Sequence, residues 1–352
     1  MRIREIEDLR GIAIIGVISI HVSAYFALQN EFNALTIANI IWDAVSSFAV
    51  PLFIFISGLV LSIRYYGRFD KRRFYRRRIE RIIPAYLLFS TIFIILTAYE
   101  TGNQPSMISL AYNYLTAHGY FHLAYIALIM QLYILYPIIL MAYDRFHKRM
   151  ITFLILLLSV QIVYSIFCYY LEDNAESDVL ISLAQRFFLL VIFYFVFGMY
   201  VGRNWDMMKR KIAGITPSGL LMIVLLCTII VSYIWSYGIS YYGSWGQTPA
   251  AYLSYAIPIR TVQYVVTFLL LIYLAMRFQS RILATMGKYS FGIYLIHPLF
   301  IYIFERMLEA TDITYNMAIF YPMMFFGVLS SSFIAIFLLG KLPHSKLIGC
   351  GT

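Results

Sequence analysis

The chain has 352 residues, of which 62% are apolar, 18% aromatic and only 12% charged. An average soluble domain has about a quarter charged residues and under half apolar residues, so this composition excludes a soluble globular protein. The 27 basic and 17 acidic residues give a net charge of +10, but they are too sparse and too segregated to indicate a nucleic-acid partner. The composition predicts an all-α, polytopic membrane protein.

Ten apolar runs are long enough to cross the hydrocarbon core, which takes about 20 residues of helix. In chain order they cover residues 11–28, 40–63, 82–98, 120–143, 150–171, 180–202, 217–237, 252–276, 288–308 and 317–340. The connections between them are short. We therefore expect a single transmembrane domain over residues 1–352, with no appended soluble domain.

Basic residues are concentrated at one end of the predicted bundle. The two terminal segments and every second connection, with Lys288 at the start of the ninth span counted among them, hold 24 of the 27 lysine and arginine residues, whereas the other five connections hold none. Those five connections carry eight of the 17 acidic residues. Because basic connections stay in the cytoplasm, we predict that both termini are cytoplasmic.

Arg10 lies at the cytoplasmic entrance of the first predicted span, and His21 lies within that span. A charged side chain at the centre of a bilayer costs roughly 3 kcal/mol on insertion scales, so each needs a partner, water or a role. His21 follows Arg10 by eleven positions, which places both side chains on one helical face about 16 Å apart. One interpretation is that both residues line a path into the membrane from the cytoplasm. The other is that Arg10 extends to the membrane surface and His21 is a structural residue, hydrogen-bonded to a neighbour.

His297 lies nine residues into the ninth predicted span, close to the depth of His21. Two histidines at matching depth can face one cavity. Pro298 lacks a backbone N–H, so it is expected to kink the helix and to free a carbonyl. Water, substrate or the neighbouring imidazole are the alternative partners of that carbonyl.

His118 and His122 have the i, i+4 spacing that places two imidazoles on one face of a helix. The residues around them include neither the glutamate of an HExxH motif nor a third ligand, so we predict no metal site. We interpret His122 as a polar residue at the outer end of the fourth span.

Three arginines lie in the outer halves of their predicted spans, against the charge rule: Arg186, Arg260 and Arg306. Ion pairs with Asp43 or Glu305 are one interpretation, because charges inside a membrane are normally paired. The other is that they bind an anionic group, such as the phosphate of a lipid-linked sugar.

The connection after the second span is strongly basic, with eight lysine or arginine residues in the fourteen positions 68–81. Such a cluster fixes topology and binds anionic membrane lipid. Arginine also binds phosphate through paired donors, so this segment is the strongest candidate site for a phosphorylated cytoplasmic cofactor. The candidates are Arg72, Arg73, Arg77, Arg78 and Arg81.

Five stretches with a characteristic mixture of polar and apolar residues lie in order along most of the chain. They are Asp8-Leu-Arg10-Gly11 with His21 downstream, Pro51-Leu-Phe-Ile-Phe-Ile-Ser57-Gly58, Arg77-Arg78-Ile-Glu-Arg81-Ile-Ile-Pro84, Tyr120-Phe-His122-Leu with Tyr133 downstream, and Tyr289-Ser290-Phe-Gly292-Ile-Tyr294-Leu-Ile-His297-Pro298. Together they resemble the acyltransferase-3 family of integral membrane acyltransferases. Ala124 departs from the pattern, because many relatives carry tryptophan there.

The resemblance implies an enzyme of the bacterial cytoplasmic membrane. Such an enzyme takes an acyl group, usually acetyl, from cytoplasmic acyl-coenzyme A, with acetyl-coenzyme A as the expected donor. It places the group on a hydroxyl of a cell-surface or lipid-linked glycan. The stretch 193–202 also resembles the subgroup that acts on extracellular poly-N-acetylglucosamine, where the acyl group can be succinyl.

The resemblance also implies roles for the candidate residues. His21 is the expected catalytic base, and Arg10 is expected to hold the coenzyme along the same helix face. The basic residues after the second span are expected to bind its nucleotide end. The expected substrate-binding residues are Ser57, His122, Tyr133, Tyr294, His297, Arg186 and Arg260.

Two alternatives remain open. A covalent acyl-imidazole intermediate on His21 is compatible with the same residues. A transporter or flippase for a glycan or lipid-linked sugar would also need charges and kinked helices inside the membrane, but it would not bind acyl-coenzyme A.

Overall fold

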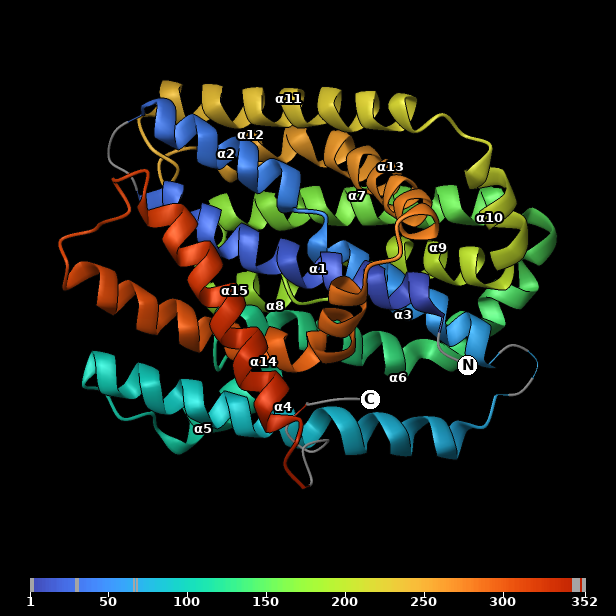
Figure 1. The fold of residues 1–352 in the computed structure, drawn as a ribbon, viewed down its shortest axis with the longest axis horizontal. Coiled ribbons are helices and arrows are strands. Elements are labelled where there is room, and N and C mark those ends of the chain that lie inside the picture. The colour runs from blue at the N-terminus through green and yellow to red at the C-terminus, as the bar shows by residue number, and fades with distance from the viewer. Residues whose placement is uncertain (1–2, 29–31, 66, 68, 344–348, 350–352) are drawn as a thin grey trace.

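The computed structural model (Figure 1) describes residues 3–28, 32–65, 67, 69–343 and 349. The described chain is an all-α bundle without a β-strand. Figure 1 shows most of the long helices running side by side along the long axis, with many of the connections at the two ends. Because these helices are long and apolar, the chain is a multi-pass membrane protein, as its composition predicts.

The bundle has long helices joined by short helices and 3₁₀ turns. In the described chain they are α1 (Arg4–Ser23), η1 (Ala24–Leu28), α2 (Ala34–Ser46), α3 (Ala49–Tyr65), α4 (Lys71–Thr101), α5 (Met107–Thr116), η2 (Phe121–Leu123), α6 (Ala124–Arg145), η3 (His147–Arg149), α7 (Met150–Asn174), α8 (Asp178–Ala184), η4 (Phe188–Leu190), α9 (Ile192–Arg203), α10 (Trp205–Ala213), α11 (Pro217–Tyr242), α12 (Ala250–Leu253), η5 (Ser254–Ala256), α13 (Ile257–Arg277), α14 (Arg281–Glu309) and α15 (Phe320–Leu339).

Nine segments of the described chain are long and apolar enough to cross a membrane, and they correspond to nine of the ten predicted spans. The exception is the predicted span 180–202, which is divided into α8, η4 and α9. The 12 residues of α9 extend about 18 Å, which is too short for a hydrocarbon core of roughly 30 Å. The prediction of a continuous helix is wrong at this position.

The short helix α9 is held in the bundle by close packing against α3. A Cβ atom at Gly58 of α3 would overlap the carbonyl of Phe195, and one at Gly198 of α9 would overlap the carbonyl of Phe55. Small residues allow two membrane helices to approach this closely, so that van der Waals contact holds them together. The contact explains how a helix of about half the membrane thickness keeps a fixed position.

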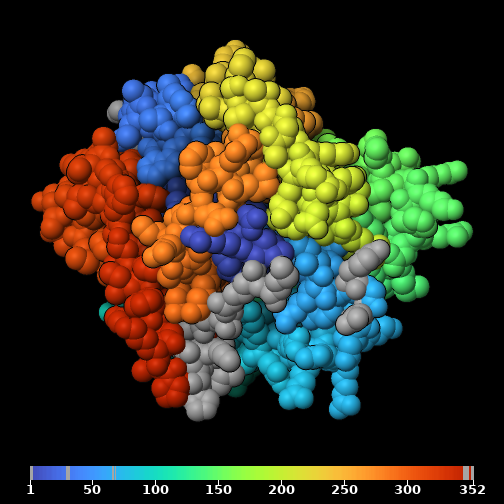
Figure 2. Space-filling model, turned by 45° about the vertical axis from the view of Figure 1, so that its right-hand side comes forward, coloured from blue at the N-terminus to red at the C-terminus, as the bar shows by residue number. Residues whose placement is uncertain are grey.

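Helix α1 lies inside the bundle. Leu9, Ala13, Ile14, Val17 and Ile18 are fully buried, and helices α2, α3, α13, α14 and α15 contact it. Figure 2 shows the start of α1 (dark blue) near the middle of one face of the molecule, with other segments around it. Arg10 and His21 of α1, which are both partly buried, therefore lie against protein rather than wholly in lipid.

The strongly basic segment is largely helical. The Asp70 side chain accepts a hydrogen bond of 3.1 Å from the backbone N–H of Arg73 and so caps the first turn of α4. Helix α4 continues for 31 residues, about 46 Å, so it is longer than the hydrocarbon core is thick. Arg78 and Arg81 are three positions apart, which places them on one face of this helix.

We predict that Gly198→Ala lowers the free energy of unfolding by about 1–3 kcal/mol, the usual cost of overpacking a core, because the new methyl group overlaps the Phe55 carbonyl. The matched control is Gly219→Ala on α11, where a new Cβ atom meets nothing within 4 Å. There alanine should stabilise the helix by up to about 1 kcal/mol. Thermal melting in detergent measures both variants, and a Gly198→Ala protein as stable as wild type would contradict the packing.

Candidate functional site

The crossing of α1 and α14 sets the geometry of the site. A Cβ atom at Gly11 would overlap the carbonyl of Leu283, and one at Gly287 would overlap the carbonyl of Glu7. Each glycine thus lies against the backbone four positions before the other glycine. The two helices touch through their backbones, which only residues without a side chain allow.

Three histidines meet further along this helix pair. His21 and His297 each follow their crossing glycine by ten residues, so both lie about 15 Å beyond the contact. Their rings stack with centroids 5.2 Å apart, and the ring of His122 lies 5.5 Å from that of His297. The structure therefore brings together the two histidines of matching depth and adds His122 from η2.

Pro298 determines how His297 is held. In a helix, the N–H of position 298 would bond to the carbonyl of position 294, but proline has no N–H. The freed carbonyl of Tyr294 instead accepts a hydrogen bond of 2.7 Å from Nδ1 of His297. This bond places a proton on Nδ1 and, in the neutral ring, leaves Nε2 as the acceptor.

The three imidazoles differ in their surroundings. His122 and His297 are 4% and 0% exposed. Among the described residues, neither ring nitrogen of His122 nor Nε2 of His297 has a hydrogen-bond partner. His21 is only partly buried. Since buried polar atoms normally have partners, the unpaired nitrogens indicate a place for water or a polar ligand.

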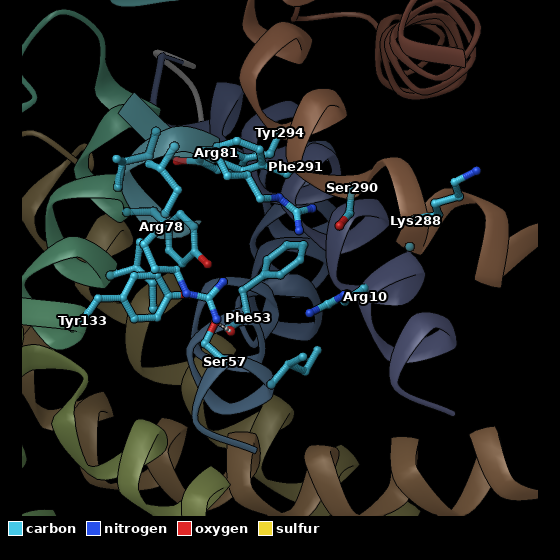
Figure 3. Close-up of a pocket in the computed structure, with 16 residues that line it drawn as sticks. Arg10, Phe53, Ser57, Arg78, Arg81, Tyr133, Lys288, Ser290, Phe291 and Tyr294 are labelled. Atoms are coloured by element: carbon cyan, nitrogen blue, oxygen red, sulfur yellow. Dashed lines mark hydrogen bonds between the residues drawn. The ribbon is translucent and has the colours of Figure 1, made fainter. Parts of the chain in front are cut away.

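A basic pocket lies between α1, α3, α4, α6 and α14 (Figure 3). Figure 3 shows the guanidinium groups of Arg10, Arg78 and Arg81 directed into one space. The ammonium group of Lys288 points away from them and lies 5.0 Å from the ring centroid of Tyr289. The polar residues of the lining are Arg10, Ser57, Arg78, Arg81, Tyr125, Tyr133, Lys288, Ser290 and Tyr294.

The three guanidinium groups are incompletely neutralised. Arg10 pairs with Glu7 at 3.3 Å, but no carboxylate of the described chain forms a salt bridge with Arg78 or Arg81. The Nε atom of Arg78 is buried without a hydrogen-bond partner in that part of the chain. Its guanidinium carbon lies 4.8 Å from the ring centroid of Tyr133. Unpaired cations in a confined pocket favour an anionic ligand, and arginine suits phosphate in particular.

Tyr294 connects the basic pocket with the histidine cluster. It lines the pocket, and its ring centroid lies 5.4 Å from that of His122 and 5.9 Å from that of His297. Its hydroxyl donates to the carbonyl of His122, and Tyr125 packs edge-on against it at 5.2 Å. The two tyrosines thus form a wall of the pocket on the side of the histidines.

Two of the five residues predicted to bind a phosphorylated cofactor, Arg78 and Arg81, line this pocket. Arg72 and Arg73 are exposed and Arg77 is partly buried, and none of these three lines it. Their place in the first two turns of α4 suits contact with anionic lipid headgroups.

Ser57 and Tyr133 also line the basic pocket. The hydroxyl of Ser57 donates to the carbonyl of Phe53 at 2.9 Å. Tyr133 is predicted to bind substrate like His122, but it lies apart from His122, with its ring 4.8 Å from the guanidinium carbon of Arg78. The reason is that ten residues of helix α6 separate Tyr133 from Leu123, about 15 Å along the axis.

The outer arginines have partners of their own. Arg186 donates to the carbonyl of Ser182 at 3.1 Å. Arg260 donates to the hydroxyl of Tyr264 at 2.7 Å and lies 4.8 Å from the ring centroid of Trp235. Neither residue lines the basic pocket.

The ion-pair interpretation applies to Arg306, although not with the expected partner. Arg306 pairs with Glu100 and Glu309, each at 3.1 Å. In the described chain, no carboxylate forms a salt bridge with Arg186 or Arg260.

His118 does not share a helical face with His122. It lies in the turn between α5 and η2, because α5 ends at Thr116. Its ring is hydrogen-bonded to the hydroxyls of Thr116 at 2.8 Å and Tyr112 at 3.2 Å. No group of metal-ligating side chains suited to a metal ion occurs among the residues that the structure describes.

Two aromatic residues of the site were missed by the sequence analysis. Phe121 lies 4.8 Å from His21 between ring centroids, and Tyr125 lines the basic pocket. Aromatic residues make up 18% of the chain, so an aromatic side chain does not by itself indicate a functional site. The available signal was that Phe121 and Tyr125 lie close to His122 in the sequence.

The comparison with known families agrees with this geometry. The chain matches an acyltransferase domain, that of the acyltransferase-3 family, over residues 3–340. The protein belongs to this family. No curated protein and no solved structure matches it. The matched range contains the basic pocket and the histidine cluster, so both lie within a membrane acyltransferase domain.

We predict that Pro298→Ala lowers the kcat of acyl transfer about tenfold, since His297, which stacks on His21, would lose its fixed orientation and a small misplacement at a site is costly. The restored N–H would compete with His297 for the Tyr294 carbonyl. The control is Pro258→Ala in the first turn of α13, where the N–H has no partner within the helix. Steady-state kinetics and thermal melting measure both variants, and an unchanged kcat in Pro298→Ala would contradict this role.

Proposed function

We propose that the protein transfers an acetyl or succinyl group from cytoplasmic acyl-coenzyme A to a hydroxyl of a cell-surface or lipid-linked glycan, in the bacterial cytoplasmic membrane. The observation that carries the proposal is that the basic pocket lies next to the histidine cluster. Three guanidinium groups converge in the pocket, and Tyr294, which lines it, contacts two of the three histidines.

The basic pocket suits the phosphates of acyl-coenzyme A. Arg78 and Arg81 supply positive charge without a carboxylate partner in the described chain, and bidentate contact with phosphate is the strongest use of such groups. Phe53 and Phe291 provide apolar lining for the pantetheine arm. Because the pocket lies at the basic end of the bundle, the donor would enter from the cytoplasm.

His21 is the proposed general base. The acceptor hydroxyl attacks the thioester carbonyl carbon while the imidazole takes the hydroxyl proton. The new C–O ester bond forms as the C–S bond breaks, and the proton passes to the departing thiolate of coenzyme A. His21 is the only partly buried member of the cluster, which makes it the most accessible to substrates.

His122 and His297 support this step. The unpaired ring nitrogens of His122 include one N–H in the neutral ring, which can donate to the oxyanion that develops on the thioester. His297 stacks on His21, and its own orientation is held by the Tyr294 carbonyl.

We predict that His21→Ala lowers acyl transfer by about 10²- to 10⁴-fold, the usual contribution of a general base. Transfer from radiolabelled acetyl-coenzyme A by purified protein measures this. The control is His147→Ala in the turn η3, because this ring is bonded to the Asp144 carbonyl in an exposed position. Full activity in a folded His21→Ala protein would remove His21 as the base.

The donor site is tested by a pair of arginines on one helix. Arg78→Ala should raise the Kd of acetyl-coenzyme A about 10- to 100-fold, because a hydrogen bond between charged groups contributes about 1.5–3 kcal/mol. Arg76→Ala should leave the Kd unchanged, since Arg76 is exposed and paired with Glu80 at 2.7 Å. Isothermal titration calorimetry in detergent measures both. A wild-type protein that binds neither acetyl- nor succinyl-coenzyme A would favour a transporter instead.

A further inference from the structure

A second cavity lies at the opposite end of the histidine cluster from the basic pocket. It is enclosed by the last turns of α4, the helix α5 and the turn before η2. Its lining residues include no lysine, arginine, aspartate or glutamate. They are Ile94, Thr97, Ala98, Thr101, Asn103, Gln104, Pro105, Ser106, Ser109, Asn113, His118, Gly119, Tyr120 and Phe121. We call this space the outer cavity, because it borders the predicted outer connection 99–119.

Phe121 joins the outer cavity to the histidine cluster. Its side chain lines the cavity and is 50% exposed, while its ring centroid lies 4.8 Å from that of His21. Tyr120 also lines the cavity, and its ring is stacked on Phe93 at 4.5 Å. A molecule in contact with Phe121 therefore lies close to His21, the proposed base, because the rings of Phe121 and His21 are neighbours.

The polar groups of the outer cavity are three side-chain amides and several hydroxyls. The side-chain amides of Asn103, Gln104 and Asn113 make no hydrogen bond within the described chain. Each amide offers two donors and one acceptor. A lining that combines unpaired amides with the aromatic rings of Tyr120 and Phe121 suits a molecule with many hydroxyls and an apolar face, such as a sugar ring.

The described lining of the outer cavity also carries no formally charged side chain. His118 is its one histidine, and its ring nitrogens are already bonded to hydroxyl groups. Burial, followed by the nearby guanidinium of Arg186, lowers the pKa of His118, so its imidazole is uncharged at neutral pH. The basic pocket favours an anion because three arginines line it, whereas no lysine or arginine of the described chain lines the outer cavity.

Helix α5 gives the outer cavity a wall with two different faces. Ser109 and Asn113, four positions apart, line the cavity. Met107, Ile108 and Leu115 are 84%, 84% and 86% exposed. A short helix with one polar and one exposed apolar face lies at a membrane surface, so the cavity would receive its ligand there.

We infer that the outer cavity is the acceptor site and that it binds one neutral sugar residue, a hexose or an N-acetylhexosamine. The sugar packs on Phe121, its hydroxyls bond to the amides of Gln104 and Asn113, and one free hydroxyl is presented toward His21. This inference rests on the proposed function, and it assigns to that reaction a site and a substrate class.

The test compares cells and purified protein that carry Asn113→Leu, Gln104→Leu or both. Mass spectrometry of the surface glycan measures its acyl content, and calorimetry measures the Kd of acetyl-coenzyme A. Each single variant should lower glycan acylation about tenfold, as expected for one lost hydrogen bond. The donor Kd should stay unchanged. The matched control is Leu115→Ala on the exposed face of the same helix, which should change neither quantity.

The outcomes separate this inference from the proposed function. Wild-type acylation in the double variant, or an equal loss of donor binding, would overturn the acceptor site alone. A wild-type protein without affinity for either acetyl- or succinyl-coenzyme A would overturn the proposed function. An acyl group carried by an acidic sugar would contradict the neutral class. Acyl sugar in the lipid extract would identify a lipid-linked acceptor, and acyl sugar in the polymer alone a surface polysaccharide.

Discussion

The glycine crossing of α1 and α14 is the constraint on which the site depends. Gly11 and Gly287 let the two helices touch through their backbones, and His21 and His297 follow at equal distances along them. Equal helical rise then brings the two imidazoles to one level, where they stack. Arg10 precedes the first glycine and is carried into the basic pocket by the same contact. Polar groups in a membrane need protein around them, and this crossing provides it.

The two cavities differ in charge in the way that the proposed reaction requires. The basic pocket presents three arginine side chains to one space, whereas no charged residue occurs in the lining of the outer cavity. A polyphosphate donor is therefore attracted to one side of the histidines only. Tyr294 lies against the cluster on the donor side, and Phe121 lies against it on the other. In the proposed reaction, this arrangement would keep the two substrates apart until they meet at His21.

Much of the fold was predictable, because apolar runs and basic connections follow directly from the cost of placing polar groups in lipid. The broken segment 180–202 was not, since its short helix depends on the contact of Gly198 with another helix, and composition does not reveal such a contact. Helical spacing predicted the matching depth of His21 and His297. It did not predict that His122 joins them, because a turn rather than a helix carries this residue.

The most direct measurement is an electron cryomicroscopy structure of the protein with a non-hydrolysable analogue of acetyl-coenzyme A. The coenzyme phosphates should lie within hydrogen-bonding distance of Arg78 and Arg81, with the acyl carbonyl beside His21. An analogue bound outside the basic pocket, or one whose acyl group lies away from the histidine cluster, would contradict the proposal that the basic pocket delivers the thioester to His21.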